Sequence, residues 1–276
     1  MDSARTPSSR TALLLGEDAV RRLAASRVLL FGLGGVGSYA AEALARSGVG
    51  HIALVDHDLV GETNLNRQLG ALHSTLGHPK VEVFRDRILD IDPGIEVDPI
   101  RLFYRPEEAE RIDFASYDYI LDAIDTVRAK VDLVQRAFAS GVPVTSCMGM
   151  GNRLDPTAVR LGDLAETSVC PLCRAMRKKL RKVGIEHLRV VYSVEPPIEV
   201  PEIHDTDELT TAKRPTPGSA VFVPAAAGLA MAADAVRHLT ATVSSALSPC
   251  PSGTPPSRRG EGACARGENT CNLCNP

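Results

Sequence analysis

Short apolar runs alternate with amphipathic segments through the first half of the chain. Five runs between residues 27 and 150 predict strands: RVLLFG, HIALVD, IEVDPI, YDYILDAID and VPVTSCMG. The segments between them have the 3.6-residue periodicity of helices. This alternation predicts a doubly wound, mostly parallel, Rossmann-like α/β sheet, in which ligands bind at the carboxyl ends of the strands.

The same patterns predict the elements on either side of this region. One amphipathic helix is expected over residues 11–26, and its apolar positions are Leu13, Leu14, Ala19, Val20 and Leu23. After residue 150 we expect a strand and turn in TAVRLGDLAET, a basic helix in CPLCRAMRKKLRKVGI and a strand in LRVVYSVEPP. An exposed loop over 195–218 then leads to a last helix over about 224–243.

The composition is that of a soluble α/β protein without a strong overall charge. The 276 residues include 31 basic and 34 acidic side chains, for a net charge of -3, and 44% are apolar. Electrostatic binding of nucleic acid by the whole surface is thereby excluded, although a local basic patch is not. The most apolar stretch, 220–233, contains Pro224 and predicts a buried core helix rather than a transmembrane segment. The polar start lacks the apolar region of a signal peptide, which predicts a cytoplasmic protein with reduced thiols.

A glycine-rich turn follows the first predicted strand. Gly32, Gly34, Gly35 and Gly37 precede an alanine-rich helix, and the next strand ends in Asp56. In this pattern the glycines permit a tight turn, amides at the helix start bind phosphates, and the acid binds ribose hydroxyls. The spacing predicts an adenine-nucleotide site, but NAD enzymes, flavoproteins and methyltransferases share it.

The polar residues that follow decide between hydride and phosphate chemistry. They are Asp58, Asn64, Asn66, Arg67, Gln68, Lys80, Asp122, Asp125 and Thr126. Arg67 and Lys80 are predicted to neutralise the phosphates of ATP during cleavage between the α- and β-phosphates. Asp125 is predicted to hold Mg²⁺ against the pyrophosphate leaving group. An NAD site has little use for these groups, so the pattern favours adenylation of a carboxylate.

Several of these residues also have a structural alternative. Asp125 can cap the helix that follows it, and Lys80 can be a solvated lysine at a helix start. Asn64 and Asn66 can serve a turn. Their joint occurrence, in order and at strand ends, favours the adenylation site.

With these residues in place, the chain resembles the ubiquitin-activating-enzyme-like (ThiF/MoeB/HesA-type) adenylating family. The motifs that carry the resemblance are GLGGVG, DHD, NLNRQ, GHPK and DAIDT, in that order. The resemblance implies ATP, Mg²⁺, adenylation of a carboxylate and a homodimer. It also implies that Arg10 reaches into the site of the neighbouring subunit.

Further motifs are similar to the tRNA threonylcarbamoyladenosine dehydratase branch of that family: RTALLLGEDAV, LDAIDTVRAK, GMGNRLDPT, TSVCPLCRAMRKKLRK, VVYSVEPP and TPGSAVFVPAAAGL. This branch implies ATP-dependent activation of the free carboxylate of threonylcarbamoyladenosine in tRNA, followed by ring closure by the carbamoyl group. No cysteine occurs in 174–249, where relatives that form a thioester or persulfide generally place one. The rivals are an adenylyltransferase for a ubiquitin-like sulfur carrier, an NAD-dependent dehydrogenase and a non-catalytic tRNA-binding scaffold.

Two clusters in the second half bear on partners and metals. The basic run Arg174, Arg177, Lys178, Lys179, Arg181 and Lys182 predicts contact with the tRNA backbone, or else a solvated helix face. The pairs Cys170/Cys173 and Cys271/Cys274 have the spacing of a zinc site, or else are free thiols. A cysteine desulfurase or sulfur-acceptor system is a further candidate partner.

These predictions give one ATP-binding adenylating domain over 1–243. It comprises the N-terminal helix 11–26, a nucleotide-binding core 27–150 and a substrate- and tRNA-facing part 151–243. Residues 244–276 are rich in Pro, Ser, Gly and Arg and predict a low-complexity tail that ends in C-x-x-C.

Overall fold

The computed structural model describes residues 7–201 and 217–241. The chain divides into two units, Met1–Ala241 and Thr242–Pro276, and every described residue belongs to the first. Cys271, Cys274 and the predicted tail therefore lie outside the described residues, as does much of the predicted loop 195–218.

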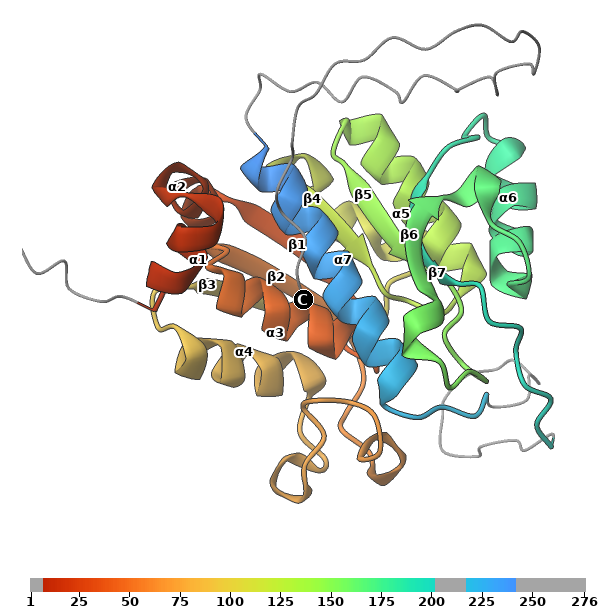
Figure 1. Cartoon of the computed structure of the whole chain (residues 1–276), viewed down its shortest axis with the longest axis horizontal. Helices are drawn as coiled ribbons and strands as arrows, with labels where there is room; N and C mark the ends of the chain where they lie inside the picture. The colour runs from red at the N-terminus through yellow and green to blue at the C-terminus, as the bar shows by residue number, and fades with distance from the viewer. Residues whose placement is uncertain (1–6, 202–216, 242–276) are drawn as a thin grey trace, which may run out of the picture. The chain divides into compact units, whose positions relative to one another are not determined.

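Seven strands form one sheet, in the order β3-β2-β1-β4-β5-β7-β6 (Figure 1). Their bounds are β1 Arg27–Phe31, β2 His51–Asp56, β3 Glu96–Arg101, β4 Tyr119–Asp122, β5 Val144–Cys147, β6 Val159–Asp163 and β7 Arg189–Ser193. Neighbouring strands are parallel except β6 and β7, which are antiparallel. The doubly wound, mostly parallel sheet is confirmed.

The alternation of side chains along each strand divides the core into two layers. Along β1, Val28 and Leu30 pack on one face of the sheet, and Leu29 and Phe31 pack on the other. The first face is covered by α3 (Gly37–Ser47), α4 (Lys80–Ile91) and α7 (Phe222–Thr240). The second face is covered by α5 (Val127–Ser140) and α6 (Pro171–Arg181). Burial on both faces explains why the strands read as continuous apolar runs.

The N-terminal segment differs from its prediction. The single helix expected over 11–26 is wrong: α1 (Ser9–Leu15) and α2 (Glu17–Ala25) are separated by Gly16, whose φ of 87° favours glycine. The expected apolar face is also interrupted, because Leu13 and Leu14 are 89% and 83% exposed while Ala19 and Leu23 are buried. The hydrophobic periodicity runs through Gly16, but the helix ends there.

The most apolar stretch of the chain lies in α7. Val223 and Ala227 are fully buried, so the stretch is a core helix, as predicted. Pro224 falls in the first turn, where a missing N–H breaks no intrahelical bond. Gly228 permits close packing against α3, since a Cβ there would lie 2.2 Å from the carbonyl oxygen of Val36. Within the described ranges, no helix combines the length and apolarity needed to cross a membrane.

A carboxylate on α7 fastens the helix to the sheet. Asp234 accepts hydrogen bonds from Tyr119 Oη on β4 (3.2 Å), Thr145 Oγ1 on β5 (2.8 Å) and Arg189 Nη2 on β7 (3.0 Å). Burial by itself raises the pKa of Asp234, but the hydrogen bonds from Arg189 and Thr145 outweigh it and hold that pKa below its ordinary value.

We expect Asp234→Ala to lower the free energy of unfolding by about 2 kcal/mol at neutral pH, because buried donors lose a charged acceptor. The folded-state pKa is depressed, so the ionised carboxylate stabilises the fold fully above the unfolded-state pKa, about 3.9. That contribution is lost as the pH falls through the folded-state pKa. Urea unfolding at several pH values measures it, and a difference from the wild type that grows toward acid pH would contradict this assignment.

Candidate active site

The predicted site residues gather where the strand connections diverge. The connection after β1 leads toward β2 on one side of the sheet, while β4 lies on the other side of β1. Parallel sheets open a crevice at such a switch point, at the carboxyl ends of the strands. The turn 32–37 follows β1, and the turn 123–126 follows β4, so both border this crevice.

The glycine turn lies against the loop after β4. Gly32 has a φ of 87°, and a Cβ on it would lie 2.8 Å from the carbonyl oxygen of Ala123. A Cβ on Gly37 would lie 1.8 Å from the carbonyl oxygen of Gly32, so a larger residue cannot occupy this position without moving the turn. By contrast, a Cβ on Gly34 would enter open space. Gly34 therefore leaves room for a ligand at the start of α3.

Carboxylates at the end of β2 join this turn to α4. Asp56 accepts hydrogen bonds from the amides of Leu33 (2.6 Å) and Asp58 (2.8 Å), which ties it to the glycine turn. Asp58 accepts one from Lys80 Nζ (2.8 Å). Lys80 is the first residue of α4 and is only 5% exposed, so the alternative of a solvated lysine is wrong.

The loop between β2 and α4 brings Asn66 and Arg67 to the turn. Arg67 Nη1 donates to the carbonyl of Thr63 (2.7 Å) and to Asn66 Oδ1 (3.0 Å). Its Cγ is 3.6 Å from the position that a Cβ on Gly35 would occupy. Buried Asn64 accepts a hydrogen bond from the amide of Gly61 (3.1 Å), so it does serve a turn. Gln68 lies half-buried in the same loop.

Asp122 is fully buried, and its carboxylate is occupied by protein groups. Lys130 Nζ on α5 lies 2.9 Å from its Oδ2, and Ser146 Oγ donates to the same oxygen at 2.6 Å. Its Oδ1 accepts from the amide of Ile124 (3.2 Å), so protein groups occupy both oxygens and leave none for a bound nucleotide, which corrects the predicted role of Asp122. Lys130 was absent from the predicted site. The sequence signal for its burial is that Lys130 lies four and seven residues before Val134 and Ala137, on the buried face of α5.

Asp125 is exposed at the mouth of the crevice, and it does not cap α5. The N-cap residue is Thr126, whose hydroxyl donates to Asp125 Oδ1 at 3.2 Å. The capping alternative for Asp125 is therefore wrong. An exposed carboxylate beside the glycine turn is suited to bind Mg²⁺, which commonly uses one or two carboxylates together with phosphate oxygens.

Arg10 is not part of this arrangement within one chain. It is an exposed residue of α1, a helix that packs on α2. Within residues 7–201 and 217–241, no hydrogen bond or ion pair joins Arg10 to the glycine turn or to the loop after β2. Its predicted role across a dimer interface stays a prediction.

Cys170 and Cys173 lie at the start of α6, and both are buried. A hydrogen bond from Cys173 lowers the pKa of Cys170, while the same bond and burial raise the pKa of Cys173. The two thiols are therefore close enough to act as neighbouring ligands.

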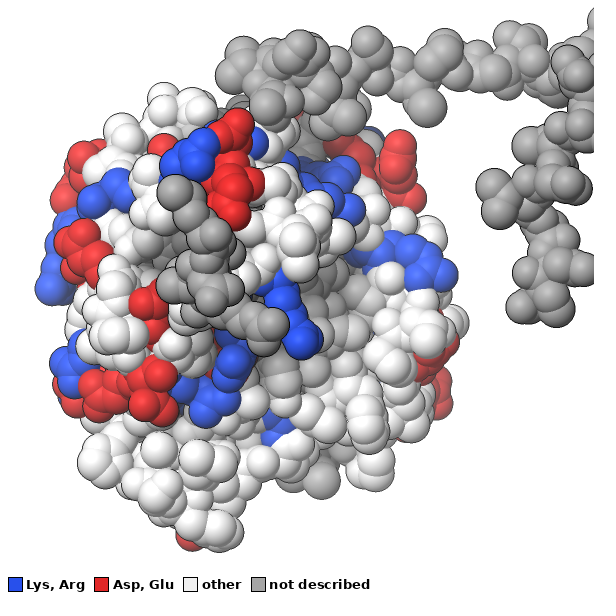
Figure 2. Space-filling model, turned by 60° about the vertical axis from the view of Figure 1, so that its left-hand side comes forward, with Lys and Arg blue, Asp and Glu red and all other residues white. Residues whose placement is uncertain are grey.

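The basic run occupies the exposed side of α6. Five of its members are exposed: Arg174, Lys178, Lys179, Arg181 and Lys182. Arg177 instead donates to the backbone carbonyls of Leu164 (3.1 Å) and Thr167 (2.7 Å). Basic and acidic residues are interspersed over the face drawn in Figure 2, so that face presents no continuous basic surface.

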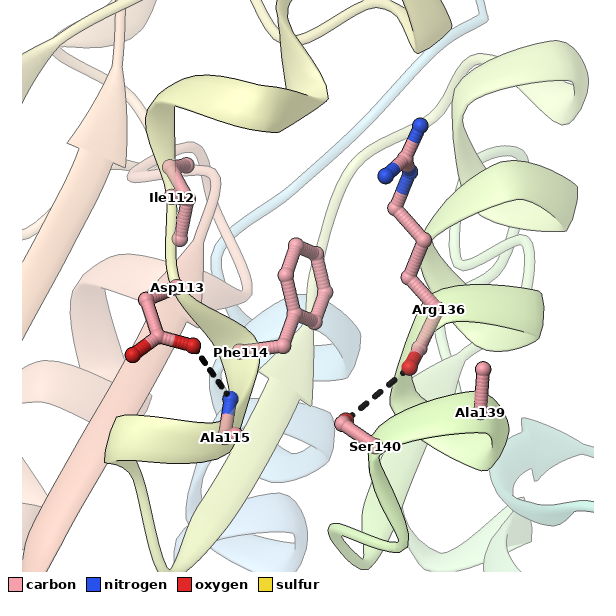
Figure 3. A pocket seen from close by; sticks show the side chains of 7 residues that line it. All are labelled: Ile112, Asp113, Phe114, Ala115, Arg136, Ala139 and Ser140. Atoms are coloured by element: carbon pink, nitrogen blue, oxygen red, sulfur yellow. Dashed lines mark hydrogen bonds between the residues drawn. The ribbon is translucent and has the colours of Figure 1, made fainter.

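A shallow pocket elsewhere on the surface has no role in this site. It lies between the segment 112–115 and the C-terminal half of α5 (Figure 3), at the opposite edge of the sheet. Its polar groups are already paired, because Asp113 Oδ1 accepts from the amide of Ala115 and Ser140 Oγ donates to the carbonyl of Arg136.

Comparison with known proteins agrees with this geometry. The family model of the ThiF family matches residues 8–252. The tRNA threonylcarbamoyladenosine dehydratase of Bacillus subtilis is 43% identical over 238 residues, which cover 84% of this chain and 93% of that protein. The Escherichia coli enzyme of the same name is 39% identical over 180 residues, 65% of this chain and 67% of that protein.

The structural comparison gives the same family of proteins. The crystal structure of the E. coli dehydratase in complex with ATP matches with a TM-score of 0.76 and 33% sequence identity. The match covers 87% of this chain and 96% of that chain.

The internal role of Asp122 can be tested by Asp122→Ala. Because the substitution leaves the buried ammonium of Lys130 uncompensated, we expect the free energy of unfolding to fall by about 3–5 kcal/mol. Urea unfolding measures this loss, and the double variant with Lys130→Met should recover part of it. If Asp122→Ala instead kept its stability and lost affinity for the nucleotide, Asp122 would be assigned a direct contact with the nucleotide.

Proposed function

Because the chain belongs to the ThiF family, we propose that it is an ATP-dependent enzyme that dehydrates threonylcarbamoyladenosine in tRNA. The observation that carries the proposal is the 43% identity to a dehydratase of that name over nearly its whole length. The ATP complex of the E. coli enzyme supports the nucleotide. The open space at Gly34 is suited to that reaction, as are the residues Asp56, Arg67, Lys80 and Asp125 that follow β2 and β4.

The proposed binding of ATP follows the geometry of the crevice. Asp56 would accept the ribose hydroxyls, and the amides at the start of α3 would bind phosphate oxygens. Arg67 and Lys80 would neutralise the negative charge that builds up when the bond between the α- and β-phosphates breaks. Lys80 is held in place by Asp58, so its ammonium is positioned before the nucleotide arrives.

The reaction then proceeds in two balanced steps. The threonyl carboxylate of the modified nucleoside attacks the α-phosphate, which forms an acyl-adenylate and releases pyrophosphate. The carbamoyl group of the same nucleoside attacks the activated acyl carbon, which closes a ring and releases AMP. The nucleoside has lost one water in total, and no enzyme nucleophile is needed.

Two metals belong to this proposal. Mg²⁺ would be held by Asp125, whose exposed carboxylate accepts a single hydroxyl contact from Thr126. When bound, Mg²⁺ offsets the charge of the pyrophosphate leaving group. Structural Zn²⁺ would take Cys170 and Cys173, whose neighbouring thiols supply half of a tetrahedral site. The other two ligands would be Cys271 and Cys274.

We propose tRNA, bound through the exposed basic residues of α6, as the macromolecular partner. We further propose a homodimer in which Arg10 reaches into the neighbouring site. A cysteine desulfurase or sulfur-acceptor system would support the enzyme, and its location would be the cytoplasm. The one-domain organisation predicted for 1–243 is retained.

The activity is tested by incubating the protein with ATP, Mg²⁺ and tRNA that carries threonylcarbamoyladenosine, followed by mass spectrometry of the digested nucleosides. We expect that nucleoside to lose one water only when ATP is present. Asp125→Ala should keep the fold and lower the rate at least about 100-fold. Asp90→Ala, which removes an exposed acid from the end of α4, is the matched control.

Two outcomes would overturn these assignments. Full activity of Asp125→Ala would remove Asp125 from the metal site. An unchanged nucleoside, combined with ATP cleavage to AMP when a small sulfur-carrier protein is added, would favour the adenylyltransferase alternative.

The tRNA surface is tested by charge reversal on α6. Because each lysine that contacts a phosphate releases a counterion, Lys178→Glu with Lys182→Glu should raise the KM for tRNA about 10-fold or more at low salt. The salt dependence of binding should also become weaker, while kcat and the affinity for ATP stay unchanged. Equal KM values for wild type and variant would move the tRNA contact away from α6.

A further inference from the structure

Arg153 is a buried cation that is not paired with a carboxylate. The side chain is 4% exposed, and it donates to three backbone carbonyls: Gly149 (2.6 Å), Gly151 (3.1 Å) and Glu195 (3.0 Å). Its Nη2 atom is buried and has no hydrogen-bond partner. Among the residues that the structure describes, no carboxylate forms an ion pair with it.

The carboxylate of Glu195, whose backbone carbonyl contacts Arg153, is already occupied. Glu195 uses its oxygens to accept hydrogen bonds from the amides of Leu154 (3.1 Å) and Asp155 (3.0 Å). The thiols Cys147 and Cys170 also lie near Arg153. Burial raises the pKa of Cys147, which keeps that thiol neutral.

A second unpartnered polar atom lies next to Arg153. The Oδ1 atom of Asn152 is buried and accepts no hydrogen bond. It faces Gly218, because a Cβ there would lie 3.3 Å from this oxygen. Consecutive residues therefore offer a free cationic donor and a free acceptor in the interior, where unpaired polar groups are costly.

Two backbone contacts place this pair beside the proposed ATP site. Asn152 donates its amide to the carbonyl of Gly218 (2.7 Å), and Asn66 Nδ2 donates to the carbonyl of the next residue, Ser219 (2.9 Å). The loop of Arg153 follows β5, the neighbour of β4, whose loop carries Asp125. The loop that carries Asn152 and Arg153 thus borders the crevice, on the side away from Asp56.

We propose that Arg153 and Asn152 form the pocket that binds the threonylcarbamoyl group of the substrate. Arg153 Nη2 would donate to the threonyl carboxylate, and Asn152 Oδ1 would accept a hydrogen bond from an N–H or hydroxyl of the same group. This inference rests on the proposed dehydratase function and adds the residues that hold the reacting carboxylate. A bound carboxylate compensates the buried guanidinium, and the guanidinium orients the carboxylate for attack on the α-phosphate.

The pocket is tested first on the wild-type protein. The probes are the free nucleoside N6-threonylcarbamoyladenosine and its analogue with a carboxamide in place of the carboxylate. Calorimetric titration should show roughly 30-fold weaker binding of the carboxamide, the effect of losing one buried charged hydrogen bond. Equal affinities would overturn the proposal without touching the proposed function, which the tRNA dehydration assay tests separately.

Substitutions then test whether Arg153 and Asn152 cause the preference for the carboxylate over the carboxamide. Arg153→Gln should abolish the preference for the carboxylate and raise the KM for modified tRNA, while the affinity for ATP changes less than about three-fold. Arg160→Gln is the matched control, since Arg160 is exposed and also donates to backbone carbonyls.

Two results would overturn the assignment. If Arg153→Gln weakens ATP binding but keeps the carboxylate preference, the anion at Arg153 is a phosphate of the nucleotide. If the variant unfolds, Asn152→Gly provides the second test, because glycine tolerates the φ of 59° at this position and the three carbonyl contacts of Arg153 are kept. Unchanged nucleoside affinity in that variant would remove Asn152 from the pocket.

Discussion

The carboxyl edge of the sheet is organised around the buried ion pair of Asp122 and Lys130. Both side chains are fully buried, so each charge is stabilised by the other and by nearby hydrogen bonds. The pair joins β4 to α5, and Ser146 adds β5. Lys130 also donates to the carbonyl of Ile124 at 3.0 Å, one residue before Asp125. The turn that carries Asp125, the proposed metal ligand, is therefore held in place by the ion pair of Asp122 and Lys130.

The two buried cations at this edge, Lys130 and Arg153, differ in whether a carboxylate of the protein neutralises their charge. Lys130 has a carboxylate partner of its own, so its charge is satisfied before any ligand arrives. Arg153, beyond the next strand, has carbonyl oxygens and a free Nη2. A desolvated cation gains most from an anion that reaches it, because little water competes for the contact. The same burial thus gives Lys130 a structural role and Arg153 an affinity for an anionic substrate.

The sequence predicts the sheet well because its signals are local. Apolar runs, the glycines of the first turn and the acid at the end of β2 each act within a few residues of where they occur. The break at Gly16 was missed because the apolar periodicity continues across it. The ion pair of Asp122 with Lys130 and the hydrogen bond of Arg153 with the carbonyl of Glu195 each join different elements of the fold. No local sequence pattern encodes such contacts. Arg153 looks like any surface arginine until the fold brings the carbonyl of Glu195 to it.

The short segment before α7 joins loops from distant parts of the chain at the proposed site. The carbonyl of Gly218 accepts a hydrogen bond from Asn152, and the carbonyl of Ser219 accepts one from Asn66. Asn66 and Ser219 are 153 positions apart in the sequence. Pro224 in the first turn of α7 lies against Gly35. Such distant contacts form only after the entropy of closing long loops has been overcome. The glycine turn, the loop after β2 and the pocket at Arg153 are therefore ordered together when α7 docks. A ligand bound by these loops is linked to that docking and stabilises the C-terminal helix on the sheet.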